Sequence, residues 1–206
     1  MAAKYKSISK RMTTPKGTAR YPRLNVPDEA FGQSKYKVDL ILDKKANSAF
    51  LKELHEFYKE CLQHERGSSE AEFPLKEVLD EDGNKVPDKI ALRFSLKSGG
   101  VTKGGKPWSQ RPTLFDAKRN PIPSDGPGIG SGSTLRVSFE ARSYLSDARK
   151  AGMSLRLLGA QVINLVEWSG GGASADEFDD EDGYEIGEAP ADLPEATASD
   201  DDSGDF

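Results

Sequence analysis

Apolar and polar positions alternate along several short stretches of the chain, which is the pattern of strands with one buried face. The clearest stretch is residues 35–42. The apolar side chains that share one of its faces are Tyr36, Val38, Leu40 and Leu42. Further strand candidates are residues 18–24, 90–96, 109–116, 134–144 and 153–168. A proline in the first of these marks it as an edge or irregular strand. The pattern therefore predicts five or six short strands.

One longer stretch, residues 47–66, has the period of an amphipathic helix instead. Its apolar positions recur every three or four residues, and its lysines and glutamates fall mainly on the other side. The central stripe consists of Phe50, Leu54, Phe57 and Cys61. Asn47 is expected to cap the start of this helix and Gly67 to end it.

The segments between these elements are polar or rich in glycine and proline, and we expect loops there. Residues 1–16 are basic and poor in apolar side chains, and we expect them to be loose. The other expected loops are residues 68–89 with a tight turn at 82–84, the basic hairpin tip 99–106, and residues 117–133 and 145–152.

Short strands at hairpin-like spacing around one helix predict a mainly β protein. We expect an OB-fold, a five- to six-stranded Greek-key barrel with one packed α-helix. A β-sandwich is the alternative, but one helix and so few strands favour the barrel.

Charge is divided unevenly along the chain. All 29 lysines and arginines lie at or before position 156. Of the 34 acidic residues, 14 follow Trp168, which leaves 20 acidic against 29 basic residues up to that point. Residues 1–168 therefore carry a net charge of +9 and residues 169–206 a net charge of −14. A basic body joined to an acidic segment indicates a polyanionic ligand and a built-in competitor for it.

Residues 169–206 are too poor in apolar side chains to offset the entropy of ordering them. We therefore expect one OB-fold domain, residues 1–168, followed by a disordered acidic tail. A bulky ring at Phe206 serves no folding purpose there, and we expect it to anchor in a partner's pocket. The acids expected to contact basic residues around that pocket are Asp200, Asp201, Asp202 and Asp205. The tail could also occupy the protein's own cationic groove when the polyanionic ligand is absent.

Several short segments place an aromatic ring within two residues of a cation. That combination binds single strands, because cations track the phosphates and rings stack on the bases. The candidate DNA-binding residues, with Arg136 added as a further cation of a predicted strand, are Arg20, Tyr21, Arg23, Lys35, Lys37, Arg93, Lys103, Lys106, Trp108, Arg136, Arg142 and Tyr144. Aromatic residues in strands more often belong to the core, and we favour that interpretation for Tyr36 and Phe94. Trp108 and Tyr144 are better stacking candidates, because the first follows a glycine-rich tip and the second ends a strand.

Several kinds of chemistry find no support in the sequence. The single cysteine excludes an intrachain disulfide, and His55 and His64 share no helix face, so a zinc site is not expected. The glycine-rich segments 104–107 and 126–132 lack the Gly-Lys-Ser/Thr of a phosphate loop. No apolar run is long enough to span a membrane. The sequence thus predicts a binding protein without a cofactor rather than an enzyme.

Three places in the sequence resemble the single-stranded DNA-binding proteins of podovirus-type bacteriophages. They are residues 31–40, the glycine-led segment 130–144, and the acidic ending 204–206. With the order of elements between them, the likeness spans nearly the whole chain. The resemblance implies an OB-fold barrel with a helix packed on it, and a homodimer held partly by tail contacts.

The resemblance also assigns roles to single positions. Tyr144 falls where the family has its stacking tyrosine, and Arg93 falls where it has a DNA-contacting lysine. Lys35 lies beside a basic position that is linked to strand annealing. Phe206 matches the terminal aromatic residue of the family.

The family's function becomes an expectation for this chain. It implies sequence-independent binding of single-stranded DNA in phage replication, recombination and repair, in the cytoplasm of the infected bacterial host. The tail would recruit the phage DNA polymerase and helicase-primase. Ser95 and Ser138 stand where the family has lysines, and Arg136 and Arg142 are the candidates to compensate.

The sequence is compatible with two other functions. The chain could be a DNA-mimicking interaction protein whose tail inhibits a host nucleic-acid enzyme, but the net charge of +9 on residues 1–168 argues against this. It could also be a metal-dependent nuclease, but residues 1–168 lack an acidic or histidine cluster.

Overall fold

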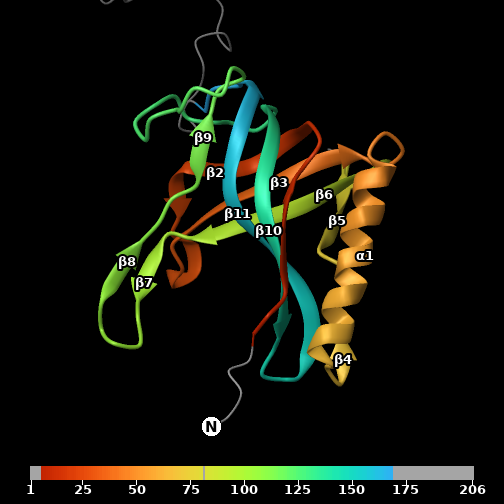
Figure 1. The fold of residues 1–206 in the computed structure, drawn as a ribbon. Helices are drawn as coiled ribbons and strands as arrows, with labels where there is room; N and C mark the ends of the chain where they lie inside the picture. Colours follow the sequence, from red (N-terminus) through yellow and green to blue (C-terminus); the bar gives the residue numbers. More distant parts are fainter. Residues whose placement is uncertain (1–5, 81, 169–206) are drawn as a thin grey trace, which may run out of the picture. The chain divides into compact units, whose positions relative to one another are not determined.

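The structure is a computed structural model that describes residues 6–80 and 82–168 (Figure 1). The predicted acidic tail, with Asp200, Asp201, Asp202, Asp205 and Phe206, lies outside the described residues. The elements in chain order are β1 (Ser9–Thr13), β2 (Gly17–Asp28), the 3-10 turn η1 (Ala30–Gly32), β3 (Lys35–Asp43), α1 (Ser48–Glu65), β4 (Ser69–Glu70), β5 (Leu75–Leu79), β6 (Lys85–Lys97), β7 (Gly99–Val101), β8 (Pro107–Ser109), β9 (Thr113–Phe115), β10 (Thr134–Leu145) and β11 (Lys150–Asn164).

Five long strands form a closed barrel in the order β2, β3, β6, β11 and β10, and β10 pairs again with β2. All neighbours are antiparallel except β6 and β11, which run parallel where Ser95 lies opposite Arg156. This strand order and this single parallel pair define an OB-fold barrel. The predicted fold class, a mainly β barrel with one packed α-helix, is confirmed.

The barrel closes where the first residues of β2 meet the start of β10. Thr18 lies opposite Thr134, and Gly17 lies opposite Leu135. A Cβ atom on Gly17 would stand 2.6 Å from the carbonyl oxygen of Ile41, closer than such atoms approach. A side chain here would push β2 away from β3, so glycine allows the tight junction.

The barrel interior is filled by the inward side chains of its strands. Phe94 of β6 and Phe139 of β10 are fully buried, with their ring centroids 4.8 Å apart. The helix α1 covers one end through Leu54, Phe57 and Cys61, as its apolar stripe predicts. Each fully buried large side chain stabilises the fold by roughly 1.5–3 kcal/mol. No helix in the described part of the chain combines the length and apolarity that a bilayer crossing needs.

Four short strands, β1, β4, β5 and β7, lie in segments for which loops were expected, so those expectations were wrong. β1 pairs with β10, although residues 1–16 were expected to be loose. β4 and β5 lie within residues 68–89, where they pair with β11 and β6. β1 and β5 each bury one side chain, Met12 and Val78 respectively. Such strands have too few apolar positions to show a period.

The ends of α1 also differ from the expectation. The Asn47 side chain makes no cap and instead donates a hydrogen bond to the carbonyl of Asp43. The left-handed residue at the other end is Arg66, with φ of 47°. Gly67 is required for packing instead, because a Cβ atom there would stand 2.6 Å from the carbonyl oxygen of Arg149.

Candidate nucleic-acid interface

The outward side chains of β3 and β6 stand opposite one another across the two strands. The opposed pairs are Lys35 with Lys97, Lys37 with Ser95, and Asp39 with Arg93. The row formed by Lys37 and Ser95 continues onto the neighbouring strand at each side. Arg23 of β2 lies opposite Lys37, and Arg156 of β11 lies opposite Ser95. A row of polar and cationic side chains thus crosses four strands of the barrel.

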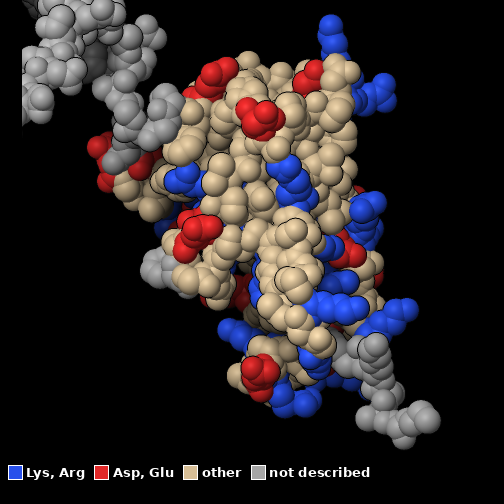
Figure 2. Space-filling model, turned by 90° about the vertical axis from the view of Figure 1, so that its left-hand side faces the viewer, with Lys and Arg blue, Asp and Glu red and all other residues tan. Residues whose placement is uncertain are grey.

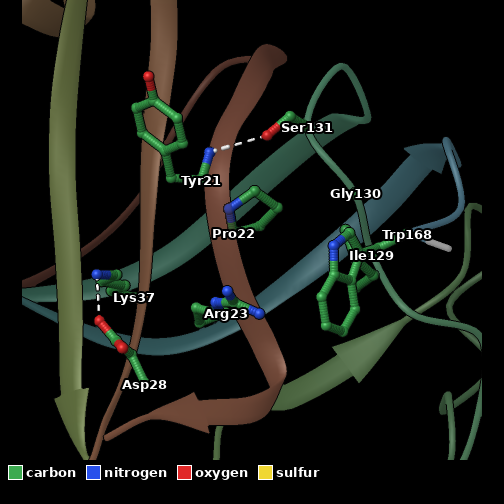
Figure 3. Close-up of a pocket in the computed structure, with 9 residues that line it drawn as sticks. All are labelled: Tyr21, Pro22, Arg23, Asp28, Lys37, Ile129, Gly130, Ser131 and Trp168. Atoms are coloured by element: carbon green, nitrogen blue, oxygen red, sulfur yellow. Dashed lines mark hydrogen bonds and ion pairs between the residues drawn. The ribbon is translucent and has the colours of Figure 1, made fainter. Parts of the chain in front are cut away.

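Three adjoining hollows lie along this face. The first hollow, of about 330 Å³, lies over β2 and the loop before β10. Figure 3 shows its lining: Tyr21, Pro22, Arg23, Asp28, Lys37, Ile129, Gly130, Ser131 and Trp168. The Arg23 guanidinium lies 4.9 Å from the ring of Trp168. This end of the face therefore pairs an exposed cation with an exposed indole ring.

The middle hollow, of about 390 Å³, lies over β3 and β6. Its lining includes Lys35, Lys37, Arg93 and Ser95. The third hollow, of about 300 Å³, lies between β6, β8, β10 and β11. Its lining includes Ser95, Lys97, Trp108, Gln110, Arg142, Ser154 and Arg156. Cations thus line all three hollows.

Shared residues join the three hollows into one continuous surface. Asp28 and Lys37 line both the first and the middle hollow. Ser95 lines both the middle and the third. We call the joined surface the cationic path. Its basic residues are Arg23, Lys35, Lys37, Arg93, Lys97, Arg142 and Arg156.

Arg93, in the middle hollow, is held by a carboxylate of the neighbouring strand. Its Nε and Nη2 atoms donate hydrogen bonds of 2.6 and 2.7 Å to the two oxygens of Asp39. Asp39 is buried, with 3% of its surface exposed, whereas Arg93 is exposed. These hydrogen bonds to Asp39 raise the pKa of Arg93 above its ordinary value. The guanidinium is therefore fixed in place, with part of its charge compensated.

Lys37 has a similar arrangement where the first and middle hollows meet. Its ammonium group donates a hydrogen bond to Asp28. That bond, together with one from the backbone N–H of Ala30, lowers the pKa of Asp28 below its ordinary value. Asp28 therefore stays ionised at neutral pH and offsets one positive charge of the path.

A carboxylate also stands among the arginines of the third hollow. The Oε2 atom of Glu140 lies 3.7 Å from an Arg156 nitrogen and 3.8 Å from an Arg142 nitrogen. Arg156 also donates a hydrogen bond of 2.9 Å to the side-chain oxygen of Gln110. Both guanidinium groups thus lie near one carboxylate above β10 and β11, and arginine is the side chain that makes bidentate hydrogen bonds to phosphate.

Trp108 and Tyr144, the two favoured stacking candidates, are outside the core, with 38% and 37% of their surfaces exposed. Trp108 lines the third hollow and lies opposite Gly100 in the β7–β8 hairpin. Tyr144 points to the same outer face as Arg142, two residues before it in β10. Its ring lies across Gly152, where a Cβ atom would stand 2.6 Å from the phenol oxygen. As expected, Tyr36 and Phe94 are buried in the core.

Some candidate residues lie apart from the three hollows. Lys103 and Lys106 belong to the exposed turn of the β7–β8 hairpin. Arg136 donates a hydrogen bond to the carbonyl of Thr14. Arg20 is half-buried, with its guanidinium 5.4 Å from the ring of Tyr21. None of these four cations lines the cationic path.

The structure adds two cations, Lys97 and Arg156, and one aromatic ring, Trp168, to the path that were not among the sequence candidates. Lys97 could have been found, since it is two positions from Ser95 and four from Arg93 in an alternating strand. Arg156 joins the path only through the parallel contact of β11 with β6, which no local pattern reveals. Within residues 6–80 and 82–168 no group of three His, Cys, Asp or Glu side chains is placed to hold a metal ion.

Figure 2 views the side of the molecule on which the β7–β8 hairpin projects in Figure 1. Lysine and arginine side chains gather across the middle and lower part of this side, with a few acidic side chains between them. OB-folds bind oligonucleotides on the face of their second and third strands, which here are β3 and β6. The described residues therefore define an OB-fold protein with a cationic surface at the position where such barrels bind ligands.

The fold is that of bacteriophage single-stranded DNA-binding proteins. The structure is similar to gp2.5, a single-stranded DNA-binding protein of bacteriophage T7, with a TM-score of 0.61, 21% sequence identity, and coverage of 80% of this chain and 98% of that one. It is also similar to the single-stranded DNA-binding protein of bacteriophage Enc34 in complex with ssDNA, with a TM-score of 0.56, 16% identity, and coverage of 78% and 89%. A C-terminal truncation of the Enc34 protein matches with a TM-score of 0.57, 16% identity, and coverage of 76% and 87%. No protein-family model and no curated protein sequence matches the chain.

Proposed function

We propose that this protein binds single-stranded DNA along the cationic path without regard to sequence. The observation that carries this proposal is the continuity of the three hollows, which share Asp28, Lys37 and Ser95. A polyanionic strand needs an unbroken series of cations at its phosphates. It also needs exposed rings for its bases, and Trp108 and Trp168 line the path at its two ends.

Exposed rings favour a single strand over a duplex, because only unpaired bases present their faces for stacking. The absence of a preferred sequence follows from the same chemistry, since every base has a stacking face. The similarity to the Enc34 protein, whose structure was solved with ssDNA, supports this ligand. The similarity to gp2.5 of bacteriophage T7 supports it independently.

The test is a titration of fluorescent dT oligomers against a duplex of equal length, at several salt concentrations. We expect tighter binding of the single strand, and a logarithm of affinity that falls by about 0.7 per phosphate contact for each tenfold increase in salt. Binding of the duplex with equal affinity would contradict the proposal. Replacing Arg142 by Gln should reduce the slope, whereas Lys44→Gln, a change beside the turn between β3 and α1, should not.

We further propose a role in phage DNA replication, recombination and repair in the cytoplasm of the infected bacterium, with the protein acting as a homodimer. In this proposal residues 169–206 recruit the phage DNA polymerase and helicase-primase and compete with DNA. The resemblance of the sequence and the net charge of −14 on that segment support it. Removal of residues 171–206 should tighten binding of dT oligomers and abolish binding to the polymerase. Weaker binding of the oligomer by the truncated protein would refute the competition.

A further inference from the structure

We propose that the first hollow is an additional nucleobase subsite, in which one unpaired base stacks on Trp168 while Arg23 contacts the adjoining phosphate. This inference rests on the proposed single-stranded DNA binding and extends it to the β2 end of the path. The subsite continues into the middle hollow through Lys37 and Asp28. The subsite lies away from Arg142 and Tyr144, which belong to the other end of the binding surface. A DNA strand bound along the whole surface would therefore cross the barrel from β10 to β2.

The Trp168 ring has the properties of a stacking platform. Half of its surface is exposed, and the guanidinium of Arg23 lies 4.9 Å from its centroid. Figure 3 shows the indole facing the hollow beside Arg23, with Lys37 on the far side of the arginine. The guanidinium lies over the ring, so a base can stack on the part of the indole that Arg23 leaves exposed while its phosphate contacts Arg23.

The platform is held by backbone contacts and not by its own side chain. The N–H of Trp168 donates a hydrogen bond of 2.9 Å to the carbonyl of Gly128, and Glu167 forms a β-bridge with Ile129. Ile129 is buried, so this loop is anchored in the core. The backbone that carries the ring is fixed in this way and loses little freedom when a base binds, which favours recognition.

Tyr21 offers a second ring at the opposite side of the hollow. It has a φ of 50°, a left-handed conformation that is unfavourable for a bulky residue, within a bulge of β2. Its N–H donates a hydrogen bond of 3.0 Å to the Ser131 hydroxyl, and 64% of its surface is exposed. Strained residues of this kind are concentrated at functional sites. In Figure 3 the rings of Tyr21 and Trp168 stand apart, on two sides of Pro22. We therefore assign them to successive bases and not to one base held between both rings.

The chain contains two tryptophans, Trp108 and Trp168, which allows a direct test. In full-length protein carrying Trp108→Phe, Trp168 is the only source of indole fluorescence. The binding of a labelled dT oligomer is followed by anisotropy, and the Trp168 emission is recorded in the same titration. We expect strong quenching by the dT oligomer, because a stacked base quenches indole emission. An abasic oligomer of equal length, which has the phosphates but no bases, should bind and leave the emission nearly unchanged.

The outcomes separate the two proposals. If the oligomer binds and the Trp168 emission stays constant, or if the abasic strand quenches it equally, the nucleobase subsite is refuted while single-stranded DNA binding stands. If the oligomer does not bind at all, the proposed function itself fails. As a second measurement, Trp168→Ala should weaken binding of dT by about fivefold or more. The matched control is Leu79→Ala, a change in β5 of an equally exposed apolar residue, which should not alter binding. Equal affinities of the two variants would also overturn the subsite.

Discussion

Replacing Asp39 by Asn should make the protein less stable and yet a stronger binder of single-stranded DNA. Asp39 is a buried carboxylate that accepts two charge-assisted hydrogen bonds from Arg93, of 2.6 and 2.7 Å. Asparagine keeps the shape and one acceptor, but its amide group faces a donor. Hydrogen bonds to charged groups contribute about 1.5–3 kcal/mol. Because Arg93 is exposed, water compensates part of this, and we expect the free energy of unfolding to fall by about 1–2 kcal/mol.

The gain in binding follows from charge compensation. In the wild-type protein the carboxylate of Asp39 offsets the guanidinium of Arg93, so this position adds little to the attraction for phosphate. Without that carboxylate, Arg93 counts as one more full cation on the path. The slope of log affinity against log salt should then steepen by about 0.7, which corresponds to roughly eightfold tighter binding at about 0.05 M salt and roughly fourfold at about 0.15 M.

The assay combines chemical denaturation with anisotropy titrations of a dT oligomer at three salt concentrations. Glu56→Gln is the charge-matched control, because Glu56 is an exposed residue of α1 and lines none of the three hollows. It should leave the slope unchanged. If the Asp39 variant binds more weakly at every salt concentration with an unaltered slope, Asp39 acts mainly by orienting Arg93. The compensation argument would then be wrong.

Three further predictions concern single residues. Tyr21→Gly should raise the free energy of unfolding by about 1 kcal/mol, because glycine tolerates a φ of 50°, and it should weaken DNA binding. A loss of stability in a denaturant melt would refute the idea that Tyr21 is strained. Gly152→Ala should lower stability by about 1–3 kcal/mol and weaken oligomer binding, because the new Cβ atom collides with the ring of Tyr144; unchanged values of both would contradict that contact. Burial raises the pKa of the Cys61 thiol to about 11, so thiol reagents at neutral pH should label it only after unfolding, and rapid labelling of the folded protein would show the burial to be wrong.

The sequence is a good guide to the elements that carry their own period. The alternation of β3 and the stripe of α1 predict both elements to within one or two residues, because each buries one face against a large core. The sequence does not predict β1 in this way. It buries only Met12 and is ordered by pairing with β10, which lies more than a hundred residues further along the chain. Such a partner leaves no trace in a local pattern.

The residues of the candidate site also fall into those that the sequence reveals and those that it does not. Lys35, Lys37 and Arg93 could be selected from the sequence because a cation stands beside a ring in an alternating strand. Arg156 and Trp168 could not, since the first depends on a contact between β11 and β6 and the second on a turn of backbone against Gly128. For Arg136 the sequence misleads in the opposite direction. Its charge makes it a candidate DNA contact, but in the structure its side chain donates a hydrogen bond to the carbonyl of Thr14.

The closure of the barrel between β2 and β10 has a consequence for synthesis on the ribosome. The segment around Thr18 emerges early, but its partner at Thr134 follows only after most of the described chain has been made. Until then the nascent sheet carries open edges, which attract strands of other chains. Pairings over such long loops also form slowly. Rapid production of this protein would therefore favour intermolecular pairing of half-made barrels, and slower translation or lower temperature should improve the yield of folded protein.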